Sequence, residues 1–357
     1  MYKKLLITLL IACSAWVASA QELYFDGEVS THFDNTEHTG SDVGESRTIF
    51  AVRVTPALGY RWNGKHSVVV GAELLKDFGS SRFIDEADFV AYYQFSNNRF
   101  GANAGIFPRE KLVGHYSRAF FSDSYLIYHN LVQGIALRYT GRNSSFAELA
   151  VDWEGLYSAE TREKFRVLVA GGGNFADIFY AGGALSLQHF ANKSTFYGNV
   201  VDNVLVNPYV GVKFNAYFDF DIRLGGLVSL QRDRKVEGGG WLIPAGGELY
   251  FRMSRWGVFI DNNLYVGANQ MPLFNSIGND GEPYADNLYA ADPFYGTRHK
   301  IYNRTGIGYE RSFVKDHIKV RAEIALQYNG QRMYCQQLIG LSATICPTIY
   351  NKANHKK

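Results

Sequence analysis

The sequence predicts an all-β protein, namely a transmembrane antiparallel up-and-down β-barrel of about sixteen strands with short periplasmic turns and long external loops. Three observations predict this fold. Apolar and polar residues alternate along many short stretches, most clearly over residues 218–231, where Phe220 and Ile222 flank Asp221. The resulting apolar faces are too numerous for one two-layer core to bury. In a barrel, lipid covers such faces while an aqueous lumen hydrates the polar ones.

The N-terminal residues 1–20 have the pattern of a secretory signal peptide. Lys3 and Lys4 precede an apolar run over residues 5–12, and Ala18-Ser19-Ala20 forms a cleavage site. A lipoprotein signal ending at Cys13 is an alternative, but the better site after Ala20 favours the secretory signal. The predicted organisation is a signal peptide over 1–20, one barrel over 21–350 and a polar C-terminal tail over 351–357.

Composition supports this class and excludes others. Mean hydropathy is only -0.17 although 46% of the residues are hydrophobic, which suits alternating strands better than helical spans. Without Lys3 and Lys4 the chain has 36 − 2 = 34 basic and 34 acidic residues, so a protein that binds nucleic acid by charge is excluded. After the signal only Cys335 and Cys346 remain, which excludes a disulfide framework and a Cys-rich metal site. No cofactor or metal is expected.

The elements follow one another with a regular rhythm of strand, short turn, strand and long loop. The predicted strands cover residues 22–33, a return strand that ends at 62, then 68–74, 87–95, 100–107, 135–139, 147–153, 165–170, 178–190, 205–214, 218–231, 243–253, 256–266, 301–313, 318–329 and 337–345. Asn63-Gly64 gives the strongest two-residue hairpin signal. The short turns fall near Asn63, Asn97, Arg142, Phe175, Ala216, Ser254 and Lys315. These short turns are every second connection along the chain, so they all lie at the same end of the barrel, which is expected to be the periplasmic end.

Aromatic residues gather beside the short turns. Pairs such as Tyr60 with Trp62, Phe214 with Phe218, and Trp256 with Phe251 flank them. Rings at one height form an interfacial girdle, since an amphipathic ring prefers the headgroup layer. Strand-end aromatics of a soluble β-protein are the alternative.

In strand number, loop parity, girdle and signal, the chain resembles the porins of Gram-negative outer membranes. The resemblance implies an outer-membrane channel for passive diffusion of small polar solutes, saccharides among them, in contact with lipid bilayer and lipopolysaccharide, and it allows a homotrimer. One departure is the C-terminus, which runs past Ile345 into Pro347 instead of ending on an aromatic residue. Ile349-Tyr350 is the candidate substitute for the insertion signal.

The third long loop, residues 108–131, is the candidate constriction. In the porins that this chain resembles, this loop folds inward and narrows the pore. Here it combines aromatic rings with charged or titratable residues, among them Arg109, Glu110, Lys111, His115, Arg118 and Asp123. An external cap or a subunit contact is the alternative.

A set of charged residues of both signs falls on the predicted lumen face. Its members are Arg53, Asp88, Arg138, Glu148, Asp152, Arg166, Asp221, Arg223, Glu248, Arg252, Arg304, Arg321 and Glu323. Pairing across strands is the favoured interpretation. The alternative interpretation is that some of these charges form an electric field across the pore that orients polar solutes.

The longest loop, residues 268–298, carries four carboxylates among several aromatic residues, namely Asp280, Glu282, Asp286 and Asp292. A plain surface loop is favoured over a sugar or calcium site, because no calcium-loop spacing is present. Enzymatic activity is not expected, since His115 with Ser117, His129 and His189 have no supporting motif. A ligand-binding or surface-assembly barrel without an open pore is the main alternative to a channel, and a barrel hydrolase a further one.

The two cysteines are predicted to be free thiols. The predicted strand 337–345 separates Cys335 from Cys346. At ~3.3 Å per residue this strand places them roughly 30 Å apart, far beyond the ~7 Å limit for the Cα atoms of a disulfide.

Overall fold

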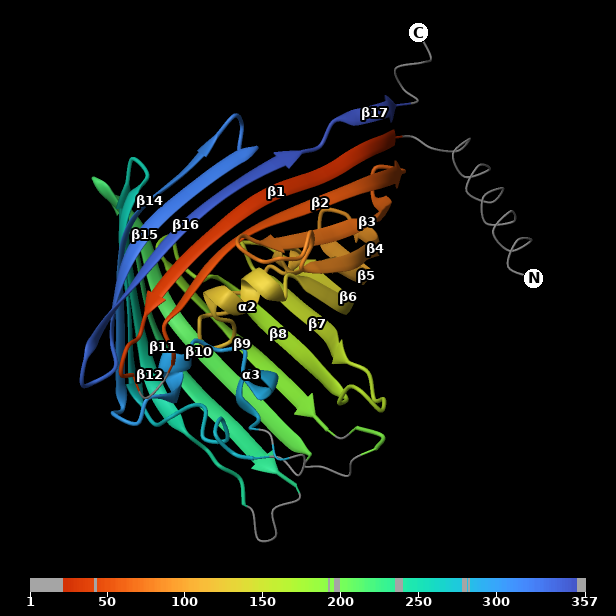
Figure 1. The fold of residues 1–357 in the computed structure, drawn as a ribbon. Coiled ribbons are helices and arrows are strands. Elements are labelled where there is room, and N and C mark those ends of the chain that lie inside the picture. The colour runs from red at the N-terminus through yellow and green to blue at the C-terminus, as the bar shows by residue number, and fades with distance from the viewer. Residues whose placement is uncertain are drawn as a thin grey trace.

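A closed barrel is the whole architecture of the computed structural model, which describes residues 22–41, 44–191, 193–195, 200–234, 240–277, 281 and 283–351 (Figure 1). Within these residues sixteen antiparallel strands follow one another around the wall. β1 (Glu22–Glu37) pairs with both β2 (Arg47–Trp62) and β16 (Met333–Ile345). Closure satisfies the backbone groups of the first and last strands, as a strand in lipid requires. The predicted signal peptide lies outside the described residues.

The predicted fold class is confirmed, and each predicted stretch is a strand with ends shifted by a few residues. The remaining strands are β3 (His66–Asp77), β4 (Glu86–Ser96), β5 (Phe100–Pro108), β6 (Leu131–Thr140), β7 (Phe146–Gly155), β8 (Lys164–Asn174), β9 (Phe179–Phe190), β10 (Val201–Ala216), β11 (Phe218–Asp233), β12 (Ala245–Arg255), β13 (Val258–Gly267), β14 (Ile301–Phe313) and β15 (Ile318–Tyr328). A short strand, β17 (Thr348–Asn351), was not predicted. It continues the pairing of β16 along β1, with Tyr350 opposite Leu23.

Side-chain alternation sets the two faces of the wall. Leu224 and Phe89 are exposed on the outside, whereas Leu227 and Val90, which point inward, are buried. The short turns lie on one side, as predicted. At the first of them Asn63 and Gly64 both have positive φ, 52° and 64°, the conformation that a two-residue hairpin turn requires.

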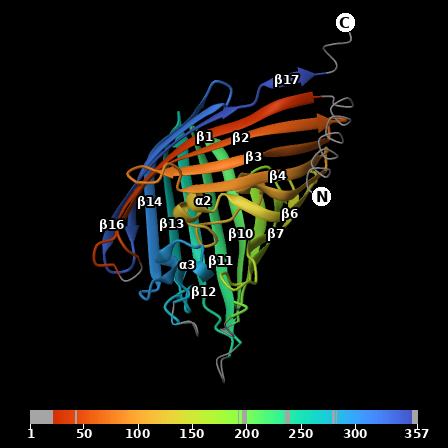
Figure 2. The same cartoon turned by 45° about the vertical axis from the view of Figure 1, so that its right-hand side comes forward.

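Two connections fold into the barrel instead of standing above it (Figure 2). The third-loop segment, residues 109–130, contains η1 (Arg109–Lys111) and α2 (Asp123–Tyr128). The long-loop segment, residues 268–300, contains α3 (Ala285–Leu288) and η2 (Pro293–Gly296). Apolar side chains of both segments belong to one buried cluster with inward-facing residues of the wall. No described helix is long and apolar enough to cross a membrane.

The expectation of a plain surface loop over residues 268–298 is therefore wrong. Phe294 and Tyr295 of this loop are completely buried. Burying such rings is favourable by ~25 cal/mol per Å² of apolar surface, so the loop folds onto the lumen wall rather than into water. Two of its four carboxylates, Asp280 and Glu282, lie outside the described residues.

Both cysteines are free, as predicted. Cys335 lies opposite Glu37 near the external end of β16. Cys346 follows the other end of the strand, where its thiol lies 3.3 Å from Asp26 Oδ1. The strand between them is the reason that they cannot meet.

Candidate functional site in the barrel lumen

The third-loop segment is fixed to the β6–β7 side of the wall by a buried ion pair. Arg109 Nη2 donates to Asp152 Oδ2 at 2.6 Å, and both side chains are buried. The same guanidinium also donates to the carbonyl oxygens of His129 and Leu131. Arg109 therefore ties the beginning of the segment to its end and to the wall at once.

Glu148 of β7 organises the next few residues of the segment. Its carboxylate accepts hydrogen bonds from Val113 N at 2.6 Å, Gly114 N at 3.0 Å and the Tyr116 hydroxyl at 2.9 Å. Backbone donors that would otherwise be buried without partners are thus satisfied. Glu148 is a structural anchor rather than a free lumen charge.

The far end of the segment reaches the β2–β3 side. Tyr128 donates to Asp77 Oδ1 at 3.0 Å, and Asn130 Nδ2 donates to Glu73 Oε2 at 2.6 Å. Arg53 donates to the carbonyl oxygen of Ile127 and pairs with Glu73. The segment therefore crosses the inside of the barrel between two parts of the wall.

The long-loop segment connects β13 to β14 and is anchored on β11 and β12. Three of its tyrosines anchor it there: Tyr284 donates to Asp233, Tyr289 to Gln231, and Tyr295 to Glu248. Each buried tyrosine hydroxyl thus has the hydrogen-bond partner that a buried tyrosine usually finds. The sequence interpretation did not identify these three tyrosines as anchors of the loop.

The two segments meet inside the barrel. Ser122 N donates to Ala290 O at 2.7 Å, and Asp292 N donates to Arg118 O at 2.8 Å. Beside this contact Arg118 holds Asp123 at 3.1 Å. Together the segments form a two-part partition across the lumen.

A ladder of alternating charges covers the wall formed by β12 to β15. Arg304 pairs with Glu323 at 2.7 Å, and Glu323 also pairs with Arg321 at 2.6 Å. Arg321 continues to Glu310 at 2.7 Å, and Arg252 lies 3.5 Å from Asp261. Most of these pairs join neighbouring strands, whereas Arg321 and Glu323 both lie on β15.

The other predicted lumen residues also face inward, with varied neighbours. Arg166 pairs with Glu154 at 2.8 Å, a partner that the sequence interpretation missed. Asp221 accepts a hydrogen bond from Tyr180, and Arg223 lies over the rings of Tyr209 and Tyr250. Arg138 lies opposite Glu148, and Asp88 opposite Glu73.

The predicted constriction residues separate into two groups. Arg109, Arg118 and Asp123 hold the partition together, and His115 lies partly buried beside the Tyr209 ring at 5.8 Å. Glu110 is exposed, and Lys111 lies 6.0 Å from the centre of the Tyr92 ring. Glu110, Lys111 and the partly exposed Asp123, which lines the main cavity of the lumen, keep charges that a passing solute could meet.

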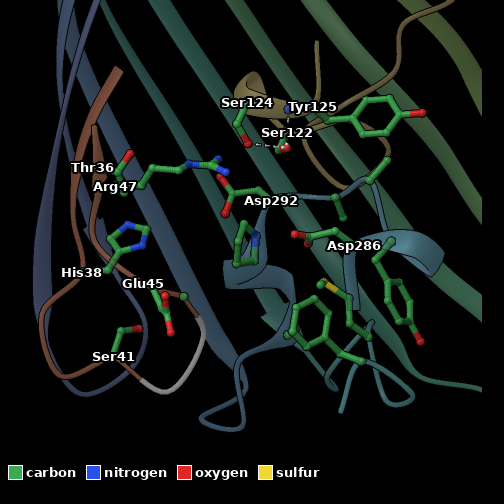
Figure 3. Close-up of a pocket in the computed structure, with 18 of the residues that line it drawn as sticks. Thr36, His38, Ser41, Glu45, Arg47, Ser122, Ser124, Tyr125, Asp286 and Asp292 are labelled. Atoms are coloured by element: carbon green, nitrogen blue, oxygen red, sulfur yellow. Dashed lines mark hydrogen bonds between the residues drawn. The ribbon is translucent and has the colours of Figure 1, made fainter. Parts of the chain in front are cut away.

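A cavity of about 1170 Å³ opens above the partition (Figure 3). His38 and Arg47 approach it from the β1–β2 side, and Asp286 and Asp292 from the long-loop segment. Rings of the third-loop segment, such as Tyr125, complete the lining. We call this cavity the vestibule. Charges of both signs beside aromatic rings suit a polar solute.

Burial and local charge shift the protonation of His38, which lines the vestibule, and of His115 in the third-loop segment. Burial, helped by repulsion from Arg47, lowers the pKa of His38 to about 4. Burial and Arg223 lower the pKa of His115 to about 3. Both imidazoles are therefore neutral at pH 7. Among the described residues no three His, Cys, Asp or Glu side chains are grouped to hold a metal ion.

One comparison with a solved structure supports the fold. The chain is similar to Pseudomonas aeruginosa OccK5 (OpdH), with a TM-score of 0.54 and 10% identity over 92% of this chain and 99% of that one. A triple mutant of the Rhodopseudomonas blastica porin has a TM-score of 0.46 and 12% identity over 90% of this chain and all of that one. A search of curated proteins found no match. The chain has the fold of a porin-like β-barrel.

One comparison corrects the expectation that the chain is not an enzyme. Residues 16–176 match the model of a family described as "Lipid A 3'-O-deacylase-type". This stretch, less than half of the chain, ends just after β8 and includes the third-loop segment. The description is that of an enzyme family, and the sequence interpretation missed it because it searched for a recognisable motif around each histidine.

Proposed function

We propose that the chain is an outer-membrane channel for passive diffusion of small polar solutes, saccharides included. The observation that carries this proposal is the partition itself: two inward segments narrow a sixteen-stranded barrel that is otherwise wide enough to hold water.

The vestibule serves as the entrance in this proposal. A solute meets rings and charges there, and then passes between the partition and the wall, where Glu110 and Lys111 contribute charges from the third-loop segment. Selectivity for ions is expected to be weak, because the charges on the wall are largely balanced by their neighbours. The homotrimer allowed by the resemblance stays a prediction.

Reconstitution into a planar bilayer tests the channel. Stepwise conductance is expected. Glu110→Gln alone should shift the ion preference toward anions and Lys111→Gln alone should shift it toward cations, and neither change should abolish conductance. Liposomes containing the heat-modifiable barrel should swell in small sugars. A folded barrel that admits neither ions nor sugars contradicts the proposal.

A second candidate function is hydrolysis of an ester in an acylated glycolipid, favoured by the family match. Within the matched stretch His32 Nε2 lies 3.1 Å from Ser30 Oγ, the arrangement of a base beside a nucleophile. Both residues face the lumen on β1, and Ser30 is buried. Acyl chains would therefore have to reach this pair from inside the barrel.

Mass spectrometry of lipid A incubated with the purified barrel tests this second function. Loss of an acyl chain is expected for the wild type, and Ser30→Ala should abolish it. Ser342→Ala is the matched control, because Ser342 faces Ser30 across the strand pair. Unaltered lipid A in every sample rules out this reaction for the chain.

A further inference from the structure

Five adjacent strands place one row of side chains on the outside of the barrel, close to the external loops. Cross-strand register joins Trp153 to Phe165, Phe165 to His189, His189 to Asp202, and Asp202 to Arg232. Each has the parity of the exposed apolar residues of its strand, so the row faces away from the lumen. It lies at the opposite end of the strands from the girdle beside the short turns.

The first half of the row consists of rings. Trp153 and Phe165 are stacked with centroids 5.3 Å apart, and the His189 ring follows at 5.1 Å. Aromatic rings on the outer face of a membrane barrel occupy the headgroup level. This half of the row therefore marks the height at which acyl chains give way to headgroups.

The second half consists of charges. Arg234 holds Asp202 through two hydrogen bonds, 2.6 Å from Nε and 2.8 Å from Nη2, and Arg232 lies 3.7 Å from the same carboxylate. The Arg232 guanidinium also covers the Trp241 ring at 4.6 Å. Two arginines thus share one carboxylate, and the Arg234 side chain is 50% exposed.

An excess of positive charge on a lipid-facing surface is costly unless an anion balances it. Guanidinium groups match phosphate oxygens in pairs and bind them more strongly than an ammonium does. We propose that the row binds the phosphate-bearing headgroup of an outer-leaflet glycolipid. Arg232 and Arg234 take the phosphate, and Trp153 and Phe165 contact the sugar and the first acyl carbons. The proposal is independent of whether the barrel conducts or hydrolyses.

Native mass spectrometry of the detergent-purified barrel tests this site, with bis-phosphorylated lipid A as probe. The wild type should retain the lipid, and Arg232→Gln with Arg234→Gln should weaken retention roughly tenfold or more, because the charged hydrogen bonds to the phosphate are lost. Arg232→Lys with Arg234→Lys should lose less. Equal retention by the wild type and the glutamine variant overturns the proposal.

Three controls make the result specific. Arg255→Gln removes another outward arginine, which stacks on Trp256 at the short-turn end, and should leave retention unchanged. Lipid A from which both phosphates have been removed should bind no better to the wild type than to the glutamine variant. If millimolar inorganic phosphate displaces the bound lipid A as effectively as added lipid A does, the site binds a free anion instead. A heat-modifiability gel shows that each variant is folded.

Discussion

Arg109 is the residue on which the position of the third-loop segment most depends. Its pair with Asp152 is buried, and removing one charge from such a pair leaves the other without compensation, at a cost of about 3–5 kcal/mol. Arg109→Gln should therefore release the segment, raise conductance and expose the segment to trypsin. Arg109→Gln combined with Asp152→Asn should reverse much of the effect, and Lys111→Gln should leave protease resistance unchanged. A resistant Arg109→Gln barrel would mean that other contacts suffice.

His115 makes the position of the same segment depend on pH. Its pKa is about 3 in the docked segment, against ~6.5 for an unperturbed imidazole. The released segment binds the proton more readily, so docking is fully stable above pH ~6.5 and weakens as the pH falls toward 3. Conductance should rise on acidification, and His115→Phe should reduce the slope of that rise.

The buried Asp292 acts in the opposite sense, because burial raises the pKa of its carboxyl and protonation favours the docked state. The measurement is therefore the difference in slope between the wild type and His115→Phe. His66→Asn, at the first short turn, is the control and should keep the slope of the wild type. Identical slopes in all three proteins would remove His115 from the account.

At the scale of elements, the two inward segments act together. Deleting residues 111–121 removes Phe120 and Phe121, which are buried in the partition, and should raise single-channel conductance severalfold. Because the long-loop segment is anchored separately through Tyr289 and Tyr295, part of the partition remains. Deleting both segments should open the pore further. Conductance that stays unchanged after the first deletion places the passage elsewhere.

The strands were predictable from sequence and the inner partition only partly so. Alternation specified β11 almost to the residue, because lipid and water impose a period of two on every spanning strand. The two ends of the third-loop segment also show in the sequence as a change from alternation to mixed rings and charges. The inward fold of residues 268–298 does not, because it depends on partners such as Glu248 and Gln231 that come from distant strands. The contact between Ser30 and His32 could not be predicted either, because it depends on the rotamers of the two side chains.

At the scale of the whole molecule, the cysteines report on closure. Cys335 and Cys346 lie at opposite ends of β16, so peptides from the unreduced protein should contain both as free thiols. Mass spectrometry after alkylation checks this, and the detergent-unfolded protein is the control for full labelling. A Cys335–Cys346 crosslink would show that β16 is not a continuous strand in the isolated protein.

The pairing of the first strand with the last has a consequence for the order of the chain. Glu22 lies opposite Asn351, so the polypeptide enters and leaves the wall at neighbouring points on the short-turn side (Figure 1). A short peptide joining these two points, with new ends opened between β3 and β4, would preserve every strand pair. The order of the strands around the barrel therefore does not depend on which strand comes first in the chain. A circularly permuted chain should fold to the same barrel as the natural one.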